Sequence, residues 1–112
     1  MRIIARRTLR EFVEGLSGRK DQRAVKAALD AWFDEVSKAV WTSSADVRRL
    51  YATASIVSAE RIVFNIKGND YRLVVSVAYR YQAVYVKFIG THAEYDAIVG
   101  EAQAAFDAVR AT

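Results

Sequence analysis

The stretch VFNIKGNDYRLVVSV, residues 63–77, decides the fold of this chain. It places two runs rich in β-branched and aromatic residues on either side of Gly68, Asn69 and Asp70, which favour tight turns. A third run of the same kind follows after a short break. The pattern predicts a meander of antiparallel strands, joined first by a hairpin loop of two or three residues, over Arg61–Ile66, Tyr71–Tyr79 and Ala83–Ile89.

Alternation along the middle run separates two faces of the predicted sheet. Because successive strand residues point to opposite sides, one face carries Tyr71, Leu73, Val75 and Val77. The other face carries Arg72, together with smaller and more polar side chains. We therefore expect the first face to pack against the core and Arg72 to lie on the less apolar face.

The first forty residues predict a short strand and two helices. Arg2–Ala5 is apolar and β-branched enough for an edge strand or second strand that precedes the first helix. Thr8 and Glu11 have the Thr-x-x-Glu spacing of a capping box, which predicts a helix start at Thr8. A second helix is predicted over residues 21–40, with apolar residues recurring every three or four positions and Trp32 in the core. Ser44 is the predicted cap of a short helical piece, and residues 51–60 stay unassigned.

The segment GTHAEYD, residues 90–96, predicts the start of a closing helix. Thr91 and Glu94 repeat the capping-box spacing, and His92, the only histidine of the chain, falls in the first turn. Later packing contacts of this helix are predicted at Ile98, Ala102, Ala105, Phe106 and Val109. Together the elements predict an α+β fold in one domain, residues 1–112, with two N-terminal helices packed on a small, mainly antiparallel sheet and a C-terminal helix.

Composition narrows the class of protein. The 112 residues are 53% hydrophobic and 27% charged, as in an ordinary globular domain. The absence of cysteine excludes a disulfide framework, and no apolar run reaches the length of a signal sequence or a membrane span, so we expect a cytoplasmic protein. A net charge of +4 and a pI near 9.6 favour phosphate-bearing or acidic partners.

Two motifs resemble the HigB-type toxins of bacterial type II toxin–antitoxin pairs, a branch of the RelE-like RNA endonucleases. They are N-I-x-G-N-x-Y-R-L at residues 65–73 and T-H-x-E-Y-D at residues 91–96. The resemblance implies a RelE-like fold and a metal-independent endoribonuclease, or mRNA interferase, that cleaves messenger RNA on the ribosome and so inhibits translation and growth. It also implies a cognate protein antitoxin, HigA-like with a helix-turn-helix domain, through which the toxin contacts DNA only indirectly.

The same resemblance points to the site residues. It carries over most directly to Arg72 and His92 as catalytic groups, with Lys67 and Tyr95 as further catalytic candidates. RNA contacts are expected from Asn65, Lys67, Lys87 and Asp96. Cleaving RNA without a metal requires a base, an acid and cations around the phosphate, and a single histidine excludes a two-histidine pair. We leave open which group is acid and which is base.

Other functions stay open at this point. His92 and Asp96 alone are too few for a metal site, so neither a metal nor a cofactor is expected. A noncatalytic basic module that binds RNA or protein with the same fold is the main alternative, and a structural domain using an open sheet edge is a third. A cluster of basic residues near the N-terminus fits ribosomal RNA contact, antitoxin docking or the exposed side of two helices equally well: Arg2, Arg6, Arg7, Arg10, Arg19, Lys20, Arg23 and Lys26.

Overall fold

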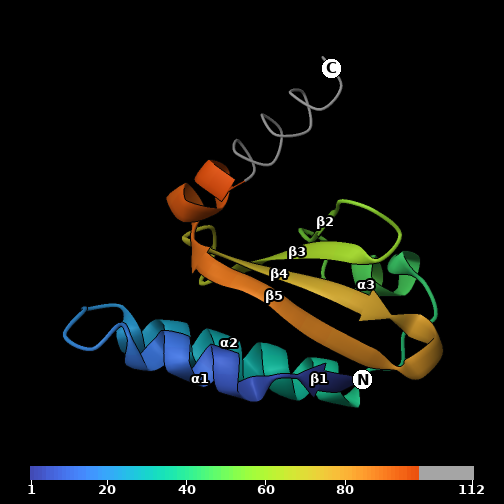
Figure 1. The fold of residues 1–112 in the computed structure, drawn as a ribbon, viewed down its shortest axis with the longest axis horizontal. Coiled ribbons are helices and arrows are strands. Elements are labelled where there is room, and N and C mark those ends of the chain that lie inside the picture. The colour runs from blue at the N-terminus through green and yellow to red at the C-terminus, as the bar shows by residue number, and fades with distance from the viewer. Residues whose placement is uncertain (99–112) are drawn as a thin grey trace, which may run out of the picture.

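The computed structural model describes residues 1–98, in which helices combine with a five-stranded mixed sheet (Figure 1). The predicted α+β class is confirmed. The sheet order is β1-β5-β4-β3-β2. The strands are β1 (Arg2–Ile4), β2 (Ser55–Ile56), β3 (Arg61–Ile66), β4 (Tyr71–Ala78) and β5 (Ala83–Thr91).

The predicted meander forms the middle of the sheet, since β3, β4 and β5 pair antiparallel in sequence order. β4 ends at Ala78, because Tyr79–Tyr81 turns into the 3-10 helix η1 before β5 begins. The predicted first strand is confirmed as β1, which pairs parallel with the start of β5. The unassigned segment contains β2, which extends the sheet beyond β3 with only two residues and therefore carries little sequence signal.

The hairpin loop between β3 and β4 is longer than predicted. Ile66 and Tyr71 are still paired, so the loop has the four residues 67–70 rather than two or three. Positive φ angles occur at Lys67 (51°) and Gly68 (63°), so they begin one residue before the turn-favouring Gly68, Asn69 and Asp70. Lys67 therefore adopts a conformation that side chains other than glycine and asparagine rarely occupy.

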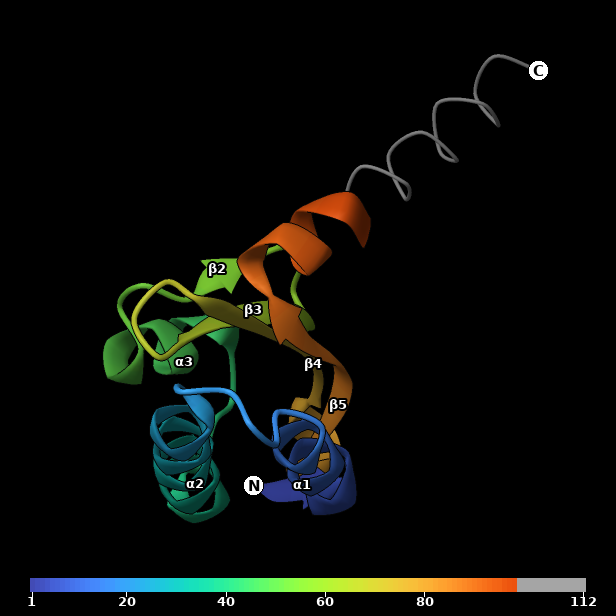
Figure 2. The same ribbon diagram turned by 90° about the vertical axis from the view of Figure 1, so that its left-hand side faces the viewer.

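All three N-terminal helices pack on the same face of the sheet, which we call the covered face (Figure 2). The ring of Phe12 packs edge-on against Tyr71 at 5.8 Å between centroids, and Trp32 packs against Phe64 at 5.5 Å. Val47 joins the same buried cluster from the third helix. The helices are α1 (Arg6–Glu14), α2 (Gln22–Lys38) and α3 (Ser44–Leu50).

The apolar side chains that the sequence assigned to the core are buried there. Trp32 is confirmed as a core residue, and Trp41 joins it in the same cluster. Tyr71, Leu73, Val75 and Val77 are all buried on the covered face, as their alternation predicted. Burial of this apolar face stabilises the sheet and fixes its register, because a shift of one residue would move the whole set into water.

The N-terminal caps predicted at Thr8 and Ser44 were wrong. α1 begins at Arg6, directly after β1, and Thr8 already lies in its first turn, with its backbone N–H bonded to Ala5 O. Glu11 therefore makes an ion pair with Arg7 at 2.7 Å instead of a capping box. The N-cap position of α3 is Ser43 rather than Ser44, and the Asp46 carboxylate accepts hydrogen bonds from both the N–H and the hydroxyl of Thr42.

The closing helix begins where the sequence predicted, with residues 92–98 helical at the end of β5. Ile98 is 45% exposed, so it does not make the packing contact expected of it. The other expected contacts, from Ala102 to Val109, lie outside the described residues. In the part of the chain that the structure describes, no helix is both long and apolar enough to cross a membrane.

Candidate functional site

The sheet face opposite the helices, which we call the open face, holds Arg72. None of the described ring contacts from α1, α2 or α3 reaches it. Strand register arranges its side chains in three rows across β3, β4 and β5, which are Asn65–Arg72–Gly90, Val63–Val74–Phe88 and Arg61–Ser76–Tyr85. Arg72 thus lies in the row nearest the hairpin loop and the start of the closing helix.

The hairpin loop holds the guanidinium of Arg72 in place. Nη1 donates to Asn69 O at 3.0 Å and to Tyr71 O at 3.3 Å, and Nη2 donates to Asn69 Oδ1 at 2.9 Å. A guanidinium has five N–H donors, so the Nε–H and one Nη2–H have no partner among the described residues. In a guanidinium, the Nε–H and the Nη2–H that faces it form one edge of the planar group. That edge has the spacing to hold two oxygens of one phosphate.

His92 follows directly after the paired end of β5. Its backbone N–H donates to Asp70 O at 3.0 Å, which continues the β4–β5 pairing by one step beyond Tyr71 and Thr91. Since Arg72 pairs with Gly90, two residues before His92, the backbone of His92 lies close to the start of the strand that carries Arg72. Both therefore come from the same end of β4 and β5.

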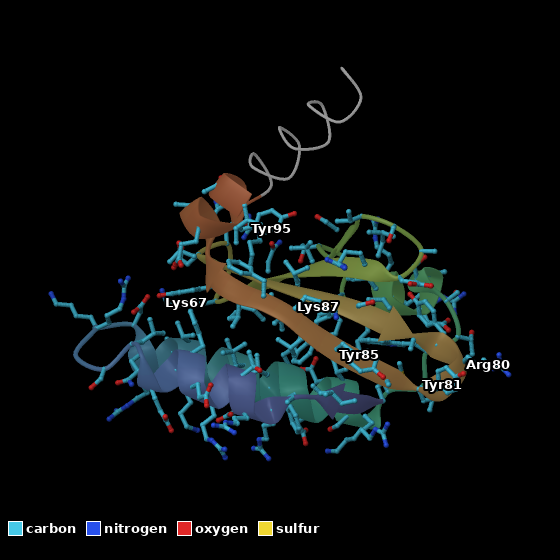
Figure 3. All side chains as sticks on the ribbon, in the orientation of Figure 1. Lys67, Arg80, Tyr81, Tyr85, Lys87 and Tyr95 are labelled. Atoms are coloured by element: carbon cyan, nitrogen blue, oxygen red, sulfur yellow. The ribbon has the colours of Figure 1, made fainter. Side chains whose placement is uncertain are left out.

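Two further predicted residues follow His92 on the same helix. Asp96 lies one turn later, and its Oδ2 is 3.2 Å from His92 Nε2. A carboxylate in this position orients the imidazole and leaves Nδ1 as the nitrogen available for proton transfer. Tyr95 is half-buried on the same turn, above the end of β5 (Figure 3). Three site candidates, His92, Tyr95 and Asp96, thus share one helical turn.

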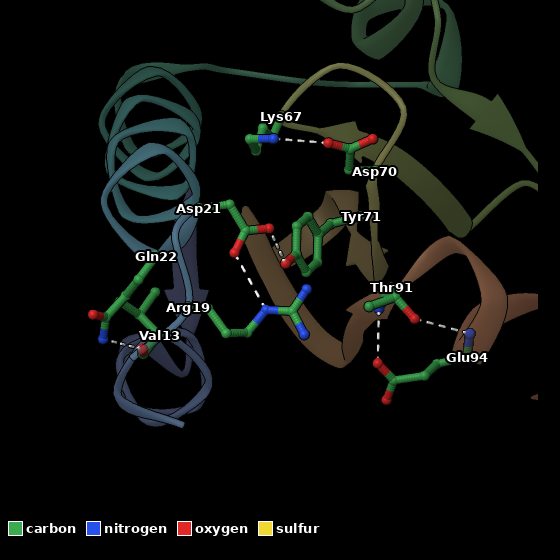
Figure 4. Close-up of polar contacts among 9 residues, drawn as sticks. All are labelled: Val13, Arg19, Asp21, Gln22, Lys67, Asp70, Tyr71, Thr91 and Glu94. Atoms are coloured by element: carbon green, nitrogen blue, oxygen red, sulfur yellow. Dashed lines mark hydrogen bonds and ion pairs between the residues drawn. The ribbon is translucent and has the colours of Figure 1, made fainter. Parts of the chain in front are cut away.

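Lys67 belongs to the same loop but turns toward the helices. Its Nζ is 2.8 Å from Asp70 Oδ2, and its side chain borders a small cavity with Ala28 and Trp32 of α2. The hydrogen bond from Lys67 to Asp70 raises the pKa of the ammonium group, so it stays charged at neutral pH. The structure brings Lys67 near the loop that holds Arg72 but directs it to the covered side of the sheet (Figure 4).

The covered face supports the Arg72 loop from behind. The hydroxyl of Tyr71, which is 1% exposed, donates to Asp21 Oδ2 at 2.6 Å, and Arg19 Nε is 3.3 Å from the other carboxylate oxygen. The hydrogen bond from Tyr71, followed by the ion pair with Arg19, lowers the pKa of Asp21. Burial and the Asp21 contact raise the pKa of the Tyr71 phenol. Tyr71 thus ties the residue before Arg72 to the start of α2 (Figure 4).

A capping box fixes the helix that carries His92. The Glu94 N–H donates to Thr91 Oγ1 and the Thr91 N–H donates to Glu94 Oε1, both at 3.1 Å (Figure 4). This confirms the reciprocal pattern predicted from Thr-x-x-Glu. Thr91 also pairs with Tyr71, so the cap connects the helix directly to the strand that carries Arg72.

The two remaining predicted RNA contacts lie on β3 and β5. Asn65 shares a row with Arg72, and its Nδ2 donates weakly to Thr53 O at 3.4 Å. Lys87 is exposed at a β-bulge, where Val74 pairs with Phe88 and Val75 pairs with Val86, leaving Lys87 out of the ladder. Lys87 has no ion-pair partner among the described residues, so its ammonium group is available to an anionic ligand there.

Sequence reasoning missed Asn69 as the residue that holds Arg72. The signal was present, since asparagine side chains in turns commonly bond to nearby groups, but only the observed loop length brings Asn69 back over Arg72. Among residues 1–98, no three His, Cys, Asp or Glu side chains come together as a potential metal site. The expectation of a metal-free reaction stays a prediction.

Comparison with known proteins identifies the family. A family model described as HigB_toxin, RelE-like toxic component of a toxin-antitoxin system, matches residues 25–98, which is more than half of the chain and includes Arg72, His92 and Asp96. No curated protein matches the chain significantly. A toxic component of a toxin–antitoxin system has a cognate antitoxin as its partner. The chain belongs to the HigB toxin family, the RelE-like toxic components of toxin–antitoxin systems.

Proposed function

We propose that the protein is the toxin of a type II toxin–antitoxin pair and acts as a metal-independent endoribonuclease that cleaves messenger RNA. The observation that carries this proposal is the position of Arg72, which is held by Asn69 and Tyr71 on β4 and pairs with Gly90, two residues before His92. Family membership supports the toxin role. The cleavage chemistry is inferred from the residues at this end of the sheet.

Arg72 stabilises the charge that develops on the scissile phosphate. Attack of the ribose 2′-hydroxyl on phosphorus makes a phosphorane with additional negative charge, and a guanidinium already fixed in place pays no reorganisation cost when that charge appears. The bonds to Asn69 and Tyr71 provide this fixation. The free edge of Arg72 then binds two non-bridging oxygens of the phosphate.

His92 moves a proton in the same reaction. Its Nδ1 acts on the 2′-hydroxyl or on the leaving 5′-oxygen, while Asp96 on Nε2 holds the ring orientation. Tyr95, on the same turn, contributes a hydroxyl and an aromatic ring for the neighbouring base. We assign Asn65 and Lys87 to binding of the RNA backbone or bases, and Lys67 to positive charge and to the geometry of the loop.

The partners follow from the same proposal. A site with few catalytic groups gains from a ribosome that holds the messenger RNA in place, so we propose cleavage on the ribosome in the cytoplasm. We further propose that the antitoxin is HigA-like and covers the open face at Arg72 and His92. The resulting loss of intact messenger RNA inhibits translation and growth.

Induced expression in bacteria tests the proposal. The wild type is compared with Arg72→Ala and His92→Ala, and with Arg48→Ala as a matched control, since Arg48 is an exposed arginine of α3 far from this end of the sheet. The wild type and the control should arrest growth and produce new 5′ ends in messenger RNA by primer extension. The two site variants should do neither. Equal growth and intact messenger RNA for all four would overturn the enzyme claim.

Purified components separate the remaining alternatives. Cleavage by toxin with programmed ribosomes should persist in EDTA-treated buffer in which Mg²⁺ alone is restored to keep the ribosomes intact, while added Zn²⁺ or Mn²⁺ should not increase it. Ribosome-free messenger RNA should be cut much more slowly. Salt-dependent RNA binding with no cleaved ends under any of these conditions would instead identify a noncatalytic RNA-binding module of the same fold.

A further inference from the structure

A stripe of aromatic and cationic side chains follows β5 away from the candidate cleavage site. It consists of Arg80, Tyr81, Tyr85, Lys87, Phe88 and Tyr95, from the 3-10 helix η1 to the closing helix (Figure 3). Tyr81 is 71% exposed, Arg80 and Lys87 are exposed, and Tyr85 is half-buried. We call this set the β5 stripe.

The β-bulge in β5 brings two of these rings to one face. Tyr85 pairs with Ser76 and Phe88 pairs with Val74, and both partners lie on the open face. Residues three apart on a regular strand would point to opposite faces. The extra residue at the bulge, Lys87, changes the alternation, so Tyr85 and Phe88 lie on the same side as Arg72.

Gly90 leaves room for the ring of Phe88 next to the strand position of Arg72. The ring of Phe88 lies over Gly90, where an added Cβ would be only 2.6 Å from the Phe88 Cζ atom. Gly90 is the direct pairing partner of Arg72. The aromatic surface therefore extends to the strand position beside the guanidinium, and any side chain at residue 90 would interrupt it.

All charged side chains on β4, η1 and β5 are positive. From Tyr71 to Thr91 the sequence contains Arg72, Arg80 and Lys87 but no aspartate or glutamate. Arg80 and Lys87 each lie 5.7 Å from the centroid of a tyrosine ring, Tyr81 and Tyr85 respectively. At this distance, near the outer limit of about 6 Å for a cation–π contact, the cations hold the rings only loosely. A nucleic-acid base can therefore take the place of the cation on the tyrosine ring, while the phosphate of the same nucleotide binds the displaced cation.

We infer that the β5 stripe is a stacking platform for single-stranded RNA, which leads the strand across the open face to Arg72 and His92. The inference rests on the proposed function in taking RNA as the ligand, and it adds the path of the nucleotides flanking the cleaved phosphate. Exposed tyrosines stack on bases of any sequence, and the cations between them track the backbone. The chemistry is that of a single-strand surface rather than a duplex site, since duplex bases offer no free π face.

A binding measurement without turnover tests the stripe. The probe is a short fluorescein-labelled oligoadenylate whose 2′-hydroxyls are methylated, so that it lacks the nucleophile for cleavage, and affinity is read by fluorescence anisotropy at several salt concentrations. Tyr85→Leu keeps an apolar side chain but loses the ring, and should weaken binding by about tenfold, whereas Tyr85→Phe should bind as the wild type does. Lys87→Ala should reduce the salt slope by about 1, and Arg48→Ala should leave the slope unchanged.

The outcomes separate this inference from the cleavage proposal. Equal affinity of the wild type, Tyr85→Leu and Tyr81→Ala would overturn the stripe even if the wild type cleaves messenger RNA in cells. Unchanged RNA binding with weaker antitoxin binding by Tyr85→Leu would likewise overturn it and identify a protein-docking surface. Ring-dependent binding by a wild type that cleaves nothing would uphold the stripe and overturn the cleavage proposal. Circular dichroism and urea unfolding confirm that each variant is folded.

Discussion

The two faces of the sheet show how one set of strands serves stability on one side and chemistry on the other. The covered face carries Tyr71, Leu73 and Val75, all buried against the helices. The open face carries Arg72 on β4 and Tyr85 and Phe88 on β5, all half-buried, around the buried Val63 and Val74. Because alternation along β4 assigns neighbouring residues to opposite faces, Arg72 has the buried residues Tyr71 and Leu73 immediately beside it.

The difference between the faces also explains how a half-buried arginine can be held in place. Arg72 is not fixed by burial, but its loop is anchored through Tyr71 to Asp21 on the covered side and through Thr91 to the cap of the closing helix. The covered face thus determines where the open face presents its donors. Substitutions on the two faces should therefore separate stability from activity.

The largest expected effect is on the covered face. Phe64 is 2% exposed and contacts Trp32, Trp41 and Tyr51. Phe64→Ala should lower the free energy of unfolding by about 3–5 kcal/mol, because it removes a large ring and leaves a cavity. Urea unfolding followed by circular dichroism measures this loss. Phe64→Leu, which keeps most of the volume, should cost much less, and equal losses for the two variants would contradict the packing account.

The next largest effect concerns activity on the open face. Arg72→Ala should reduce messenger RNA cleavage on ribosomes by about 10²–10³-fold, which corresponds to about 2.7–4 kcal/mol of barrier for one preorganised donor. Its free energy of unfolding should stay within about 0.5 kcal/mol of the wild type. Arg72→Lys keeps the charge but lacks the planar donor edge, and should recover little activity. A variant that lost activity only in proportion to its stability would make Arg72 a structural residue.

A smaller effect is expected at the cap of the closing helix. Thr91→Ala removes the hydroxyl that accepts from the Glu94 N–H, and should cost about 1 kcal/mol of unfolding free energy. Thr91→Ser retains the acceptor and serves as the matched control. Because the cap positions His92, Thr91→Ala should also slow cleavage while Thr91→Ser should not. Identical unfolding midpoints for the two variants would show that the cap contributes nothing.

The smallest effect depends on pH. The Tyr71 hydroxyl lowers the pKa of Asp21 below its ordinary value of 3.8 in the folded protein, so this contact adds stability above that value and loses it as pH falls through the folded pKa. Tyr71→Phe should therefore be less stable than the wild type at neutral pH, and the difference should shrink in acid. Urea unfolding at pH 7 and pH 3 measures both. A difference that grew in acid would contradict the sign of this linkage.

Regular side-chain patterns made much of the fold predictable from sequence. β3, β4 and β5 follow from alternation and turn residues, and α2 follows from an apolar stripe that ends up buried against the sheet. β2 was not predictable, because two residues paired at a sheet edge show no periodicity. The same Thr-x-x-Glu spacing forms a capping box at Thr91 but not at Thr8. The reason is that α1 follows β1 closely and already begins at Arg6, two residues before Thr8.

The candidate site was predictable only in part, for a related reason. The family resemblance pointed to Arg72 and His92 as candidates, and their segments adjoin at the same end of β4 and β5. It did not reveal that Lys67 turns to the helices, because that follows from a positive φ at Lys67 and a four-residue loop. Nor did it reveal that a bulge at Lys87 brings Tyr85 and Phe88 together, since a bulge depends on pairing between strands.

A double-mutant cycle tests most directly whether Arg72 and His92 act on one phosphate. Cleavage of ribosome-bound messenger RNA is measured under single-turnover conditions for the wild type, Arg72→Ala, His92→Ala and the double variant. If both groups serve the same reacting phosphate, the double variant should be far less impaired than the product of the two single losses. Losses that multiply, or a single variant with the wild-type rate, would contradict a shared site.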